Sequence, residues 1–188
     1  SAINNEDADE PQELQIQRYI ASRSIALVIM GVPGVYFHGL LGSKNDAELV
    51  LEEKETRSIN RKNINKDELI RSLENPETTT SMVTKMMLEL IRKRIHEKAF
   101  HPNASQKVIN ISKDIFAVIR IDADHTSAVL AIVNVTDKLI DLEVKKDTLD
   151  CKCIDGFELI EGKTYKFKND IIDIHLKPYQ VVWLKFVS

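Results

Sequence analysis

A chain of 188 residues, of which 43% are hydrophobic and 29% are charged, has the composition of a protein that folds in water around one large core or two modest ones. The formal net charge of −3, with 26 basic and 29 acidic residues interspersed, gives no broad basic surface, so we expect no nucleic-acid partner. The longest apolar run, residues 25–35, is broken by Gly31, Pro33 and Gly34 and is too short to cross a bilayer. Because no basic-then-apolar leader precedes it, we expect a cytoplasmic protein without a membrane segment.

The first predicted element is a helix that follows an acidic, polar start. Proline is favoured in the first turn of a helix, and Pro11 heads a pattern that includes Ile20 and the apolar run from Ile25. Gly31 ends this predicted helix, and Pro33 prevents it from resuming. We expect the helix to become more buried towards its end.

A β-strand is predicted next, over residues 32–37. Every side chain in this stretch except proline and glycine is apolar, which is typical of a parallel strand that is covered on both faces. A loop from Gly39 to about Lys62 follows, in which Gly39 and Gly42 turn the chain. The sequence Gly42-Ser43-Lys44 lacks the order and spacing of a phosphate-binding P-loop, so we interpret these glycines as structural.

Two helices are predicted after the loop. The first is short and covers residues 65–75, and the second is capped by the threonine and serine cluster after Pro76. The apolar stripe of the second helix consists of Met82, Val83, Met86, Met87, Leu90, Ile91 and Ile95. Because the methionines continue into leucine and isoleucine, we interpret the stripe as core packing rather than as an adaptable binding groove.

From about Lys107 the hydrophobic period changes to two. Seven β-rich runs follow, over residues 114–122, 126–136, 139–144, 149–155, 157–167, 171–176 and 179–187. Glu161-Gly162 predicts a hairpin, and Asp155-Gly156 predicts another turn. Seven or eight strands at this spacing predict an antiparallel β-sandwich.

The two cysteines, Cys151 and Cys153, lie two residues apart in one of these runs. On a strand they share a face and are too constrained to pair with each other comfortably. No Cys-x-x-Cys spacing or nearby histidine cluster completes a ligand set, so we expect two reduced, buried core residues and no metal site.

The predicted strand at residues 32–37 has no predicted neighbours. A parallel strand must form hydrogen bonds to a strand on each side, and nothing later in the chain repeats its pattern. We therefore predict that residues 1–103 are the C-terminal part of a (β/α)8 barrel and that residues 104–188 are a C-terminal antiparallel β-sandwich. The loop after the strand then lies at the active-site face of the barrel.

Four stretches carry a resemblance to a known family. "GVPGVYFHGLLGSKND", "ETRSINR", "AFHPNASQKVINI" and "LKPYQVVWLKF" together resemble the end of the sucrose-phosphorylase group in the α-amylase superfamily, glycoside hydrolase family 13. Sucrose phosphorylases proper tend to show aspartate where Ser58 stands. This serine, together with "HGLLGSKND" and "AFHPNA", resembles more closely the relatives that phosphorolyse glucosides of charged or phosphorylated acceptors, such as glucosylglycerate or sucrose 6-phosphate.

The resemblance implies a retaining double displacement at an α-glucosidic bond. An aspartate takes the glucosyl group, a glutamate protonates the leaving oxygen, and inorganic phosphate attacks the covalent intermediate to give glucose 1-phosphate. In the family, the catalytic carboxylates lie on earlier barrel strands, so none of the 29 acidic residues here is assigned a catalytic role. The expected partners are a small glucoside, inorganic phosphate and the missing N-terminal barrel, with a homodimer left open and no cofactor. The segment alone should be inactive.

Four residues are candidates for substrate binding. The resemblance implies that Arg57 lines the closed end of the glucosyl subsite, where its fixed fork holds a carboxylate and sugar hydroxyls. Asn60 and Arg61 support the shape of the loop or face phosphate. His38, at the end of the predicted strand, either lies near the substrate or is a packing residue.

Two other functions stay open from the sequence. The parent protein could be an α-glucoside hydrolase or transglucosidase of the same superfamily. Such an enzyme differs from a phosphorylase only in whether phosphate or another acceptor attacks the covalent intermediate. The chain could instead be a non-catalytic carbohydrate-binding β-sandwich, which predicts an exposed aromatic platform for sugar rings. The single tryptophan, Trp183, lies inside an alternating apolar run, which disfavours this second alternative.

Overall fold

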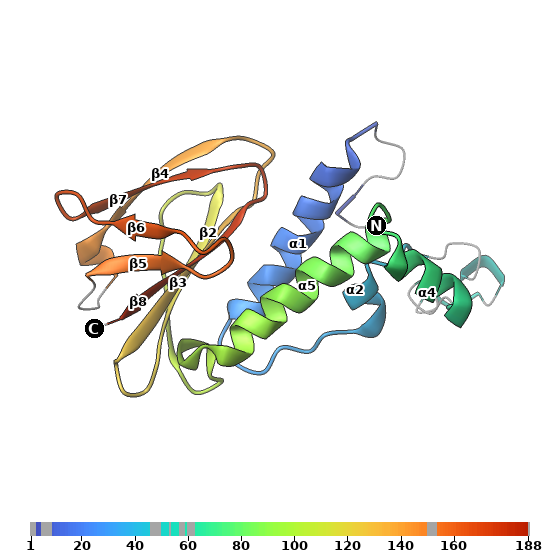
Figure 1. The fold of residues 1–188 in the computed structure, drawn as a ribbon, viewed down its shortest axis with the longest axis horizontal. Coiled ribbons are helices and arrows are strands. Elements are labelled where there is room, and N and C mark those ends of the chain that lie inside the picture. The colour runs from blue at the N-terminus through green and yellow to red at the C-terminus, as the bar shows by residue number, and fades with distance from the viewer. Residues whose placement is uncertain are drawn as a thin grey trace.

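The computed structural model describes residues 3–4, 9–45, 50–52, 54–56, 59, 63–149 and 154–187. Helices occupy its first part: α1 (Gln12–Val28), α2 (Phe37–Leu41), α4 (Lys66–Glu74), α5 (Thr79–His96) and the 3-10 helix η2 (Lys98–Phe100). Strands occupy the second part: β1 (Ser105–Val108), β2 (Ile115–Ile121), β3 (Ser127–Asn134), β4 (Ile140–Lys145), β5 (Asp155–Glu158), β6 (Thr164–Lys166), β7 (Ile171–Leu176) and β8 (Val181–Val187). A second 3-10 helix, η3 (Lys146–Thr148), follows β4. Figure 1 shows α1 and α5 side by side, extending from the strands with one end of each helix near the β-sandwich.

The strands form an antiparallel sandwich of two unequal sheets. The larger sheet has the order β1-β2-β3-β8-β5-β6, and β4 pairs with β7 in the smaller one. Every strand pair recorded in the described residues is antiparallel. The predicted sandwich is confirmed by this topology.

Two hydrophobic cores lie on opposite faces of the larger sheet. Along β3, Leu130 and Ile132 point into the core between the two sheets, and Val129 and Ala131 point into a second core beneath the helices. Trp183 of β8 is fully buried in the second core, with its ring centroid 5.0 Å from that of Phe100. The helices therefore form a third layer, which explains why β3 is buried on both faces.

The strand part differs from its prediction in two places. Asp155-Gly156 does not form a turn but begins β5, where an added Cβ on Gly156 would lie 3.0 Å from the ring of Phe186. The strand β1 was not predicted because three of its four side chains are exposed and carry no apolar alternation. The hairpin at Glu161-Gly162 is confirmed, with Gly162 at φ 75° between β5 and β6. Cys151 and Cys153 lie outside the described residues.

The helices follow local sequence signals closely. Pro11 is the N-cap of α1, the Asn65 side chain accepts hydrogen bonds from two amides of α4, and the Thr78 hydroxyl accepts one from Ser81 of α5. Two details were wrong. α1 ends at Val28 and not at Gly31, and Ile95, predicted in the buried stripe of α5, is 66% exposed because the buried face through Met87 and Leu90 continues to Arg94 in the last turn.

The prediction of a buried strand at residues 32–37 needs the largest correction. Residues 32–36 form no strand in the described chain, and residues from Phe37 onward form α2 instead of a loop. Val32, Tyr36 and Phe37 are 82%, 58% and 54% exposed. The physical reason is that a strand requires hydrogen-bonding neighbours, and no described segment pairs with this one. The division of the chain at residue 103 stays a prediction.

Candidate functional site at the end of the extended segment

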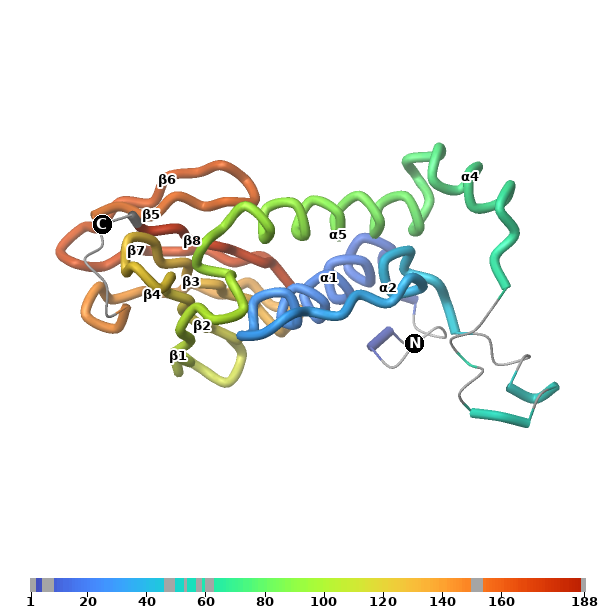
Figure 2. Tube along the Cα trace, turned by 90° about the horizontal axis from the view of Figure 1, so that it is seen from below, coloured from blue at the N-terminus to red at the C-terminus, as the bar shows by residue number. Residues whose placement is uncertain are grey.

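The candidate site lies where the chain turns back from α1. The last two residues of α1 and the three that follow, called here the turn at residues 27–31, lie near the sheet and lead into the extended segment, residues 32–36, which runs back beside α1 to α2 (Figures 1 and 2). Gly31 has φ 119°, a conformation that side-chain-bearing residues rarely adopt, so glycine suits this reversal. The path places α2 at the end of the molecule opposite the β-sandwich.

Contacts from α1 and α5 fix the short helix α2. The Tyr19 hydroxyl donates a hydrogen bond to the Gly39 carbonyl at 2.6 Å, and Leu41 is buried. Gly42 ends α2 with φ 62°, and an added Cβ there would lie 3.0 Å from Val83. Gly42 therefore turns the chain as predicted, whereas Gly39 lies inside the helix.

His38 is the one candidate binding residue that the described structure places. It is half-buried on α2, with its ring centroid 5.3 Å from that of Tyr36 and 6.0 Å from that of Phe37. These aromatic neighbours are themselves largely exposed. His38 thus belongs to an exposed aromatic cluster at the end of the extended segment and not to a packed core.

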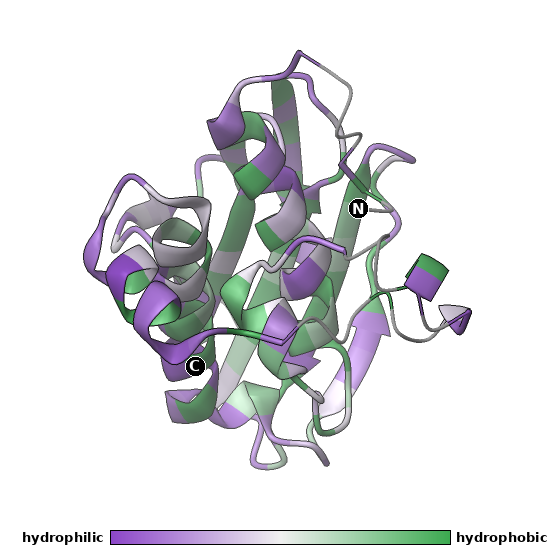
Figure 3. Ribbon diagram, turned by 90° about the vertical axis from the view of Figure 1, so that its right-hand side faces the viewer, coloured by the Kyte–Doolittle hydropathy of each residue, from purple (hydrophilic) through white to green (hydrophobic). Residues whose placement is uncertain are grey.

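A groove of about 600 Å³ passes this cluster, between α1 and the extended segment. His38 lines it together with Ser43 and Lys44 beyond α2, and Tyr19 and Arg23 line it from α1. The Arg23 guanidinium lies 5.0 Å from the centroid of the Tyr19 ring. Sequence reasoning missed this pair, whose only signal was the i,i+4 spacing on one helix. Figure 3 shows the end of the molecule that carries α2, with hydrophobic stretches in green.

The other three candidate residues cannot be placed beside His38. Arg57, Asn60 and Arg61 lie outside the described residues. Their roles in binding a glucosyl group or phosphate stay predictions.

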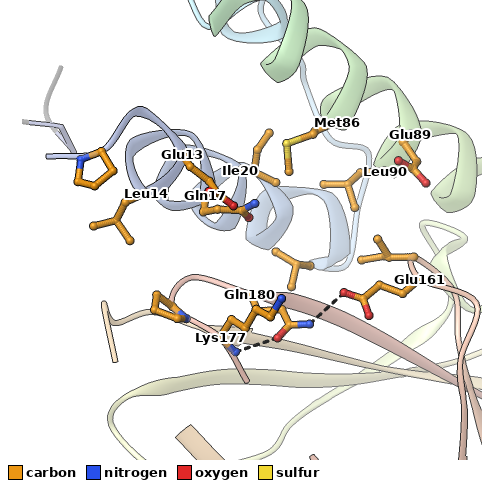
Figure 4. A pocket seen from close by; sticks show the side chains of 14 residues that line it. Glu13, Leu14, Gln17, Ile20, Met86, Glu89, Leu90, Glu161, Lys177 and Gln180 are labelled. Carbon is orange, nitrogen blue, oxygen red and sulfur yellow. Dashed lines mark hydrogen bonds between the residues drawn. The ribbon is translucent and has the colours of Figure 1, made fainter. Parts of the chain in front are cut away.

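A second cavity, of about 490 Å³, lies between the helices and the β-sandwich (Figure 4). Its apolar lining includes Ile20 and Leu90, and its rim carries Glu161 and Gln180. The Gln180 amide donates to Glu161 at 3.3 Å and accepts from the backbone amide of Lys177 at 2.8 Å. These bonds connect the rim residues to one another, and none of the described residues that line the cavity is aromatic, so it does not have the character of a sugar-stacking site.

Other kinds of site find no support in the part of the chain that the structure describes. None of its His, Cys, Asp and Glu side chains form a group of three that could hold a metal ion. None of its helices is both long and apolar enough to cross a membrane. Trp183 is fully buried and cannot act as an exposed platform for sugar rings.

Comparison with known proteins gives relatives over almost the whole chain. Glucosylglycerate phosphorylase from Spirochaeta thermophila is 31% identical over 191 residues, which span 98% of this chain and 32% of the relative. Sucrose phosphorylase from Streptococcus mutans is 30% identical over 121 residues, which span 64% of this chain and 24% of the relative. The chain thus spans about a third or less of these curated relatives. No protein-family model matches the chain.

Solved structures agree on the fold. An α-amylase from Geobacillus thermoleovorans, solved with acarbose, superposes with a TM-score of 0.70 at 12% identity and covers 92% of this chain and 34% of its own. This likeness confirms the predicted fold class, the last units of a (β/α)8 barrel followed by an antiparallel β-sandwich. At such identity it speaks for the fold alone.

Proposed function

We infer that this chain, a homologue of glucosylglycerate and sucrose phosphorylases, is the C-terminal part of a retaining glycoside phosphorylase. The complete enzyme reversibly transfers an α-glucosyl group from a small glucoside to inorganic phosphate and releases glucose 1-phosphate. The observation that carries this proposal is the homology to a glucosylglycerate phosphorylase along 98% of the chain. The α-amylase likeness supports the fold in which such chemistry would take place.

The extended segment supports the proposal that more of the barrel exists. Residues 32–35 pair with no strand in the described chain, and the apolar side chains of Val32 and Val35 are 82% and 42% exposed. An exposed, extended backbone beside apolar surface is a template on which another strand can pair, and such pairing removes the apolar surface from water. We propose that strands from the preceding part of the barrel pair with residues 32–36 on both sides and fill the groove beside α1.

In the complete enzyme, we assign substrate binding to four residues of this chain. Arg57 holds the closed end of the glucosyl subsite, Asn60 and Arg61 shape the loop or contact phosphate, and His38 lies near the substrate. The catalytic carboxylates belong to the preceding barrel, so this chain alone is inactive. Residues 1–103 form the barrel part and residues 104–188 the sandwich. The proposal includes a cytoplasmic location, and size-exclusion chromatography of the complete enzyme tests whether it is a homodimer.

The test is the fate of the glucosyl group. The complete enzyme is incubated with phosphate and with glucosylglycerate, sucrose or sucrose 6-phosphate in parallel, and glucose 1-phosphate and free glucose are both quantified. We expect glucose 1-phosphate to accumulate in step with consumption of one glucoside. Release of free glucose alone at saturating phosphate contradicts the proposal and identifies a hydrolase.

Arg57→Lys examines the binding assignment. Lysine keeps the charge but loses the two-pronged geometry, so one or two charge-assisted hydrogen bonds are lost, and kcat/KM should fall about 10- to 100-fold. The matched control is Arg71→Lys, at an exposed arginine of α4, which should leave kcat/KM unchanged. Equal kinetics for the two variants contradict the role of Arg57.

A further inference from the structure

The turn at residues 27–31 is held by side chains from distant parts of the chain. The last carbonyls of any α-helix lack partners within the helix, and α1 has no basic residue in its own last turn. Arg94 of α5 supplies the missing donors. Its Nε donates to the Leu27 carbonyl at 2.7 Å, and its Nη2 donates to the Gly31 carbonyl at 3.2 Å.

The β-sandwich supplies further contacts to the same turn. Arg120 of β2 is fully buried, and its Nη1 donates to the Val28 carbonyl at 2.8 Å. Gln106 of β1 accepts a hydrogen bond from the Met30 amide at 2.7 Å. Two of these three side chains, Gln106 and Arg120, therefore come from strands, although the turn itself belongs to the helical part.

Arg120 also fixes the connection between the two parts. Its remaining donors reach the His101 carbonyl at 2.8 Å, the Ala104 carbonyl at 3.2 Å and the Ser105 carbonyl at 3.1 Å. One guanidinium thus joins the end of α1 to the chain that enters β1. Because a guanidinium is planar and rigid, these four carbonyls are held in a fixed arrangement.

Placing two arginines here has an electrostatic cost. Burial lowers the pKa of Arg120, and the nearby positive charge of Arg94 lowers this pKa further. Burial likewise lowers the pKa of Arg94. The negative end of the α1 dipole and the bonded carbonyls offset part of this cost. Neither guanidinium has a carboxylate among its recorded hydrogen-bond or ion-pair partners, so both charges are bonded to backbone carbonyls of the turn and of the connection into β1.

The extended segment starts directly at this turn and ends at α2. Five residues of extended chain span roughly 16 Å. The turn holds one end of this segment, and α2, which carries His38, holds the other. We propose that Arg94 and Arg120 are positioning residues for glucosyl transfer: by fixing the turn at residues 27–31, they set the path of the extended segment that leads to His38. This assignment rests on the proposed phosphorylase function and gives the β-sandwich a part in ordering the active-site face of the barrel.

The test uses the complete enzyme with Arg94→Met, Arg94→Lys and Arg120→Lys, and with Arg92→Met as the matched control at an exposed arginine of α5. Steady-state kinetics are measured well below the unfolding midpoint of each variant. A shift of about 1 Å in reacting groups can reduce the rate about 100-fold, so we expect kcat to fall about 10- to 100-fold in Arg94→Met with a smaller change in KM. Arg94→Lys, which keeps one donor group, should recover part of the loss, and Arg92→Met should match the wild type.

A purely structural role would lower only the unfolding midpoint. Wild-type kcat and KM in folded Arg94→Met, whatever its midpoint, overturn the proposal. If Arg120→Lys does not fold, Gln106→Leu takes its place. It removes one hydrogen bond to the turn, and kcat should fall about two- to tenfold. Wild-type kcat and KM in Gln106→Leu refute the proposal that the β-sandwich helps to order the active-site face.

Amide hydrogen exchange separates this proposal from the proposed function. If the wild-type enzyme makes no glucose 1-phosphate, the phosphorylase assignment fails on its own. Exchange at residues 29–36 still reports whether the arginines fix the turn. If residues 29–36 exchange faster in Arg94→Met than in Arg92→Met, Arg94 fixes the turn. Equal exchange in the two variants refutes this role.

Discussion

Removal of the Asp122 carboxylate should destabilise the β-sandwich measurably. Asp122 is 4% exposed and lies just after β2, where its side chain folds over the turn into β3. Its Oδ1 accepts hydrogen bonds from the Thr126 amide at 2.8 Å and the Ser127 amide at 3.0 Å, and its Oδ2 accepts one from the Thr126 hydroxyl at 2.8 Å. The carboxylate therefore satisfies three donors in a turn that joins two central strands.

The magnitude follows from these bonds. A hydrogen bond to a charged group contributes about 1.5–3 kcal/mol, but three bonds to one carboxylate do not add fully because water can reach part of an opened turn. We expect Asp122→Ala to lower the free energy of unfolding by about 2–3 kcal/mol, measured by urea denaturation at neutral pH. The control is Asp124→Ala in the same turn, at an exposed aspartate, which should change it by less than about 0.5 kcal/mol.

The pH dependence of the free energy of unfolding provides a second test of the stabilisation by the Asp122 carboxylate. Burial raises the pKa of Asp122, but hydrogen bonds from Ser127 and Thr126 outweigh burial and hold the pKa below its ordinary value of 3.8. A carboxyl whose pKa is lower in the folded state stabilises the protein above its unfolded pKa, and this contribution disappears as the pH falls through the folded pKa. The difference between wild type and Asp122→Ala should therefore shrink below about pH 4. A difference that stays constant down to about pH 2, or one no larger than that of Asp124→Ala, refutes this reasoning.

Three further predictions concern packing, backbone strain and ionisation. Leu130→Ala should lower the free energy of unfolding by about 3–5 kcal/mol in urea denaturation, because Leu130 is fully buried between the two sheets, and a loss below about 1 kcal/mol would contradict that placement. Gly42→Ala should destabilise the chain by more than Gly162→Ala. Both have positive φ and incur about 1–2 kcal/mol of strain, but only at Gly42 would the new Cβ lie 3.0 Å from a buried side chain, so equal losses would count against the packing of α2 on α5. The pKa of His175, measured by NMR titration, should lie above 6.5, because the Asp141 carboxylate at 2.6 Å raises it. The pair should stabilise the fold below pH 6.5 and lose this effect as the pH rises through the folded pKa. A His175 pKa in Asp141→Asn equal to that in the wild type would contradict the pairing.

The sequence predicted the β-sandwich well because its strands obey a simple rule. Side chains alternate between core and solvent in β4 and β7, and the continuous apolar run of β3 reflects the helices that cover its other face. Edge strand β1 lacked any such signal because it borders only one neighbour and exposes most of its side chains. Alternation detects strands that bury a face, and it misses strands that exist only through backbone pairing.

The extended segment shows the opposite failure. Its composition correctly indicated an extended, apolar stretch whose neighbours are absent from this chain, but without those neighbours the segment forms no strand and its side chains are exposed. The helix α2 was missed because a five-residue helix has little signal of its own and depends on contacts such as the one between Tyr19 and Gly39.

The candidate site was only partly predictable. The resemblance supplied Arg57, Asn60 and Arg61, which no periodicity could have singled out. The contacts of Arg94 with Leu27 and of Arg120 with Val28 join residues 67 and 92 positions apart. A cation bonded to backbone carbonyls leaves no pattern in the partner sequence, since every residue carries a carbonyl.

The measurement that tests the account most directly is amide hydrogen exchange at residues 32–36, compared between this chain alone and the complete protein. If strands from the rest of a barrel pair with the segment, its amides exchange rapidly in the isolated chain and slowly in the complete protein. Equally rapid exchange in both would contradict the account, because the segment would then be a surface connection and not a strand of a barrel.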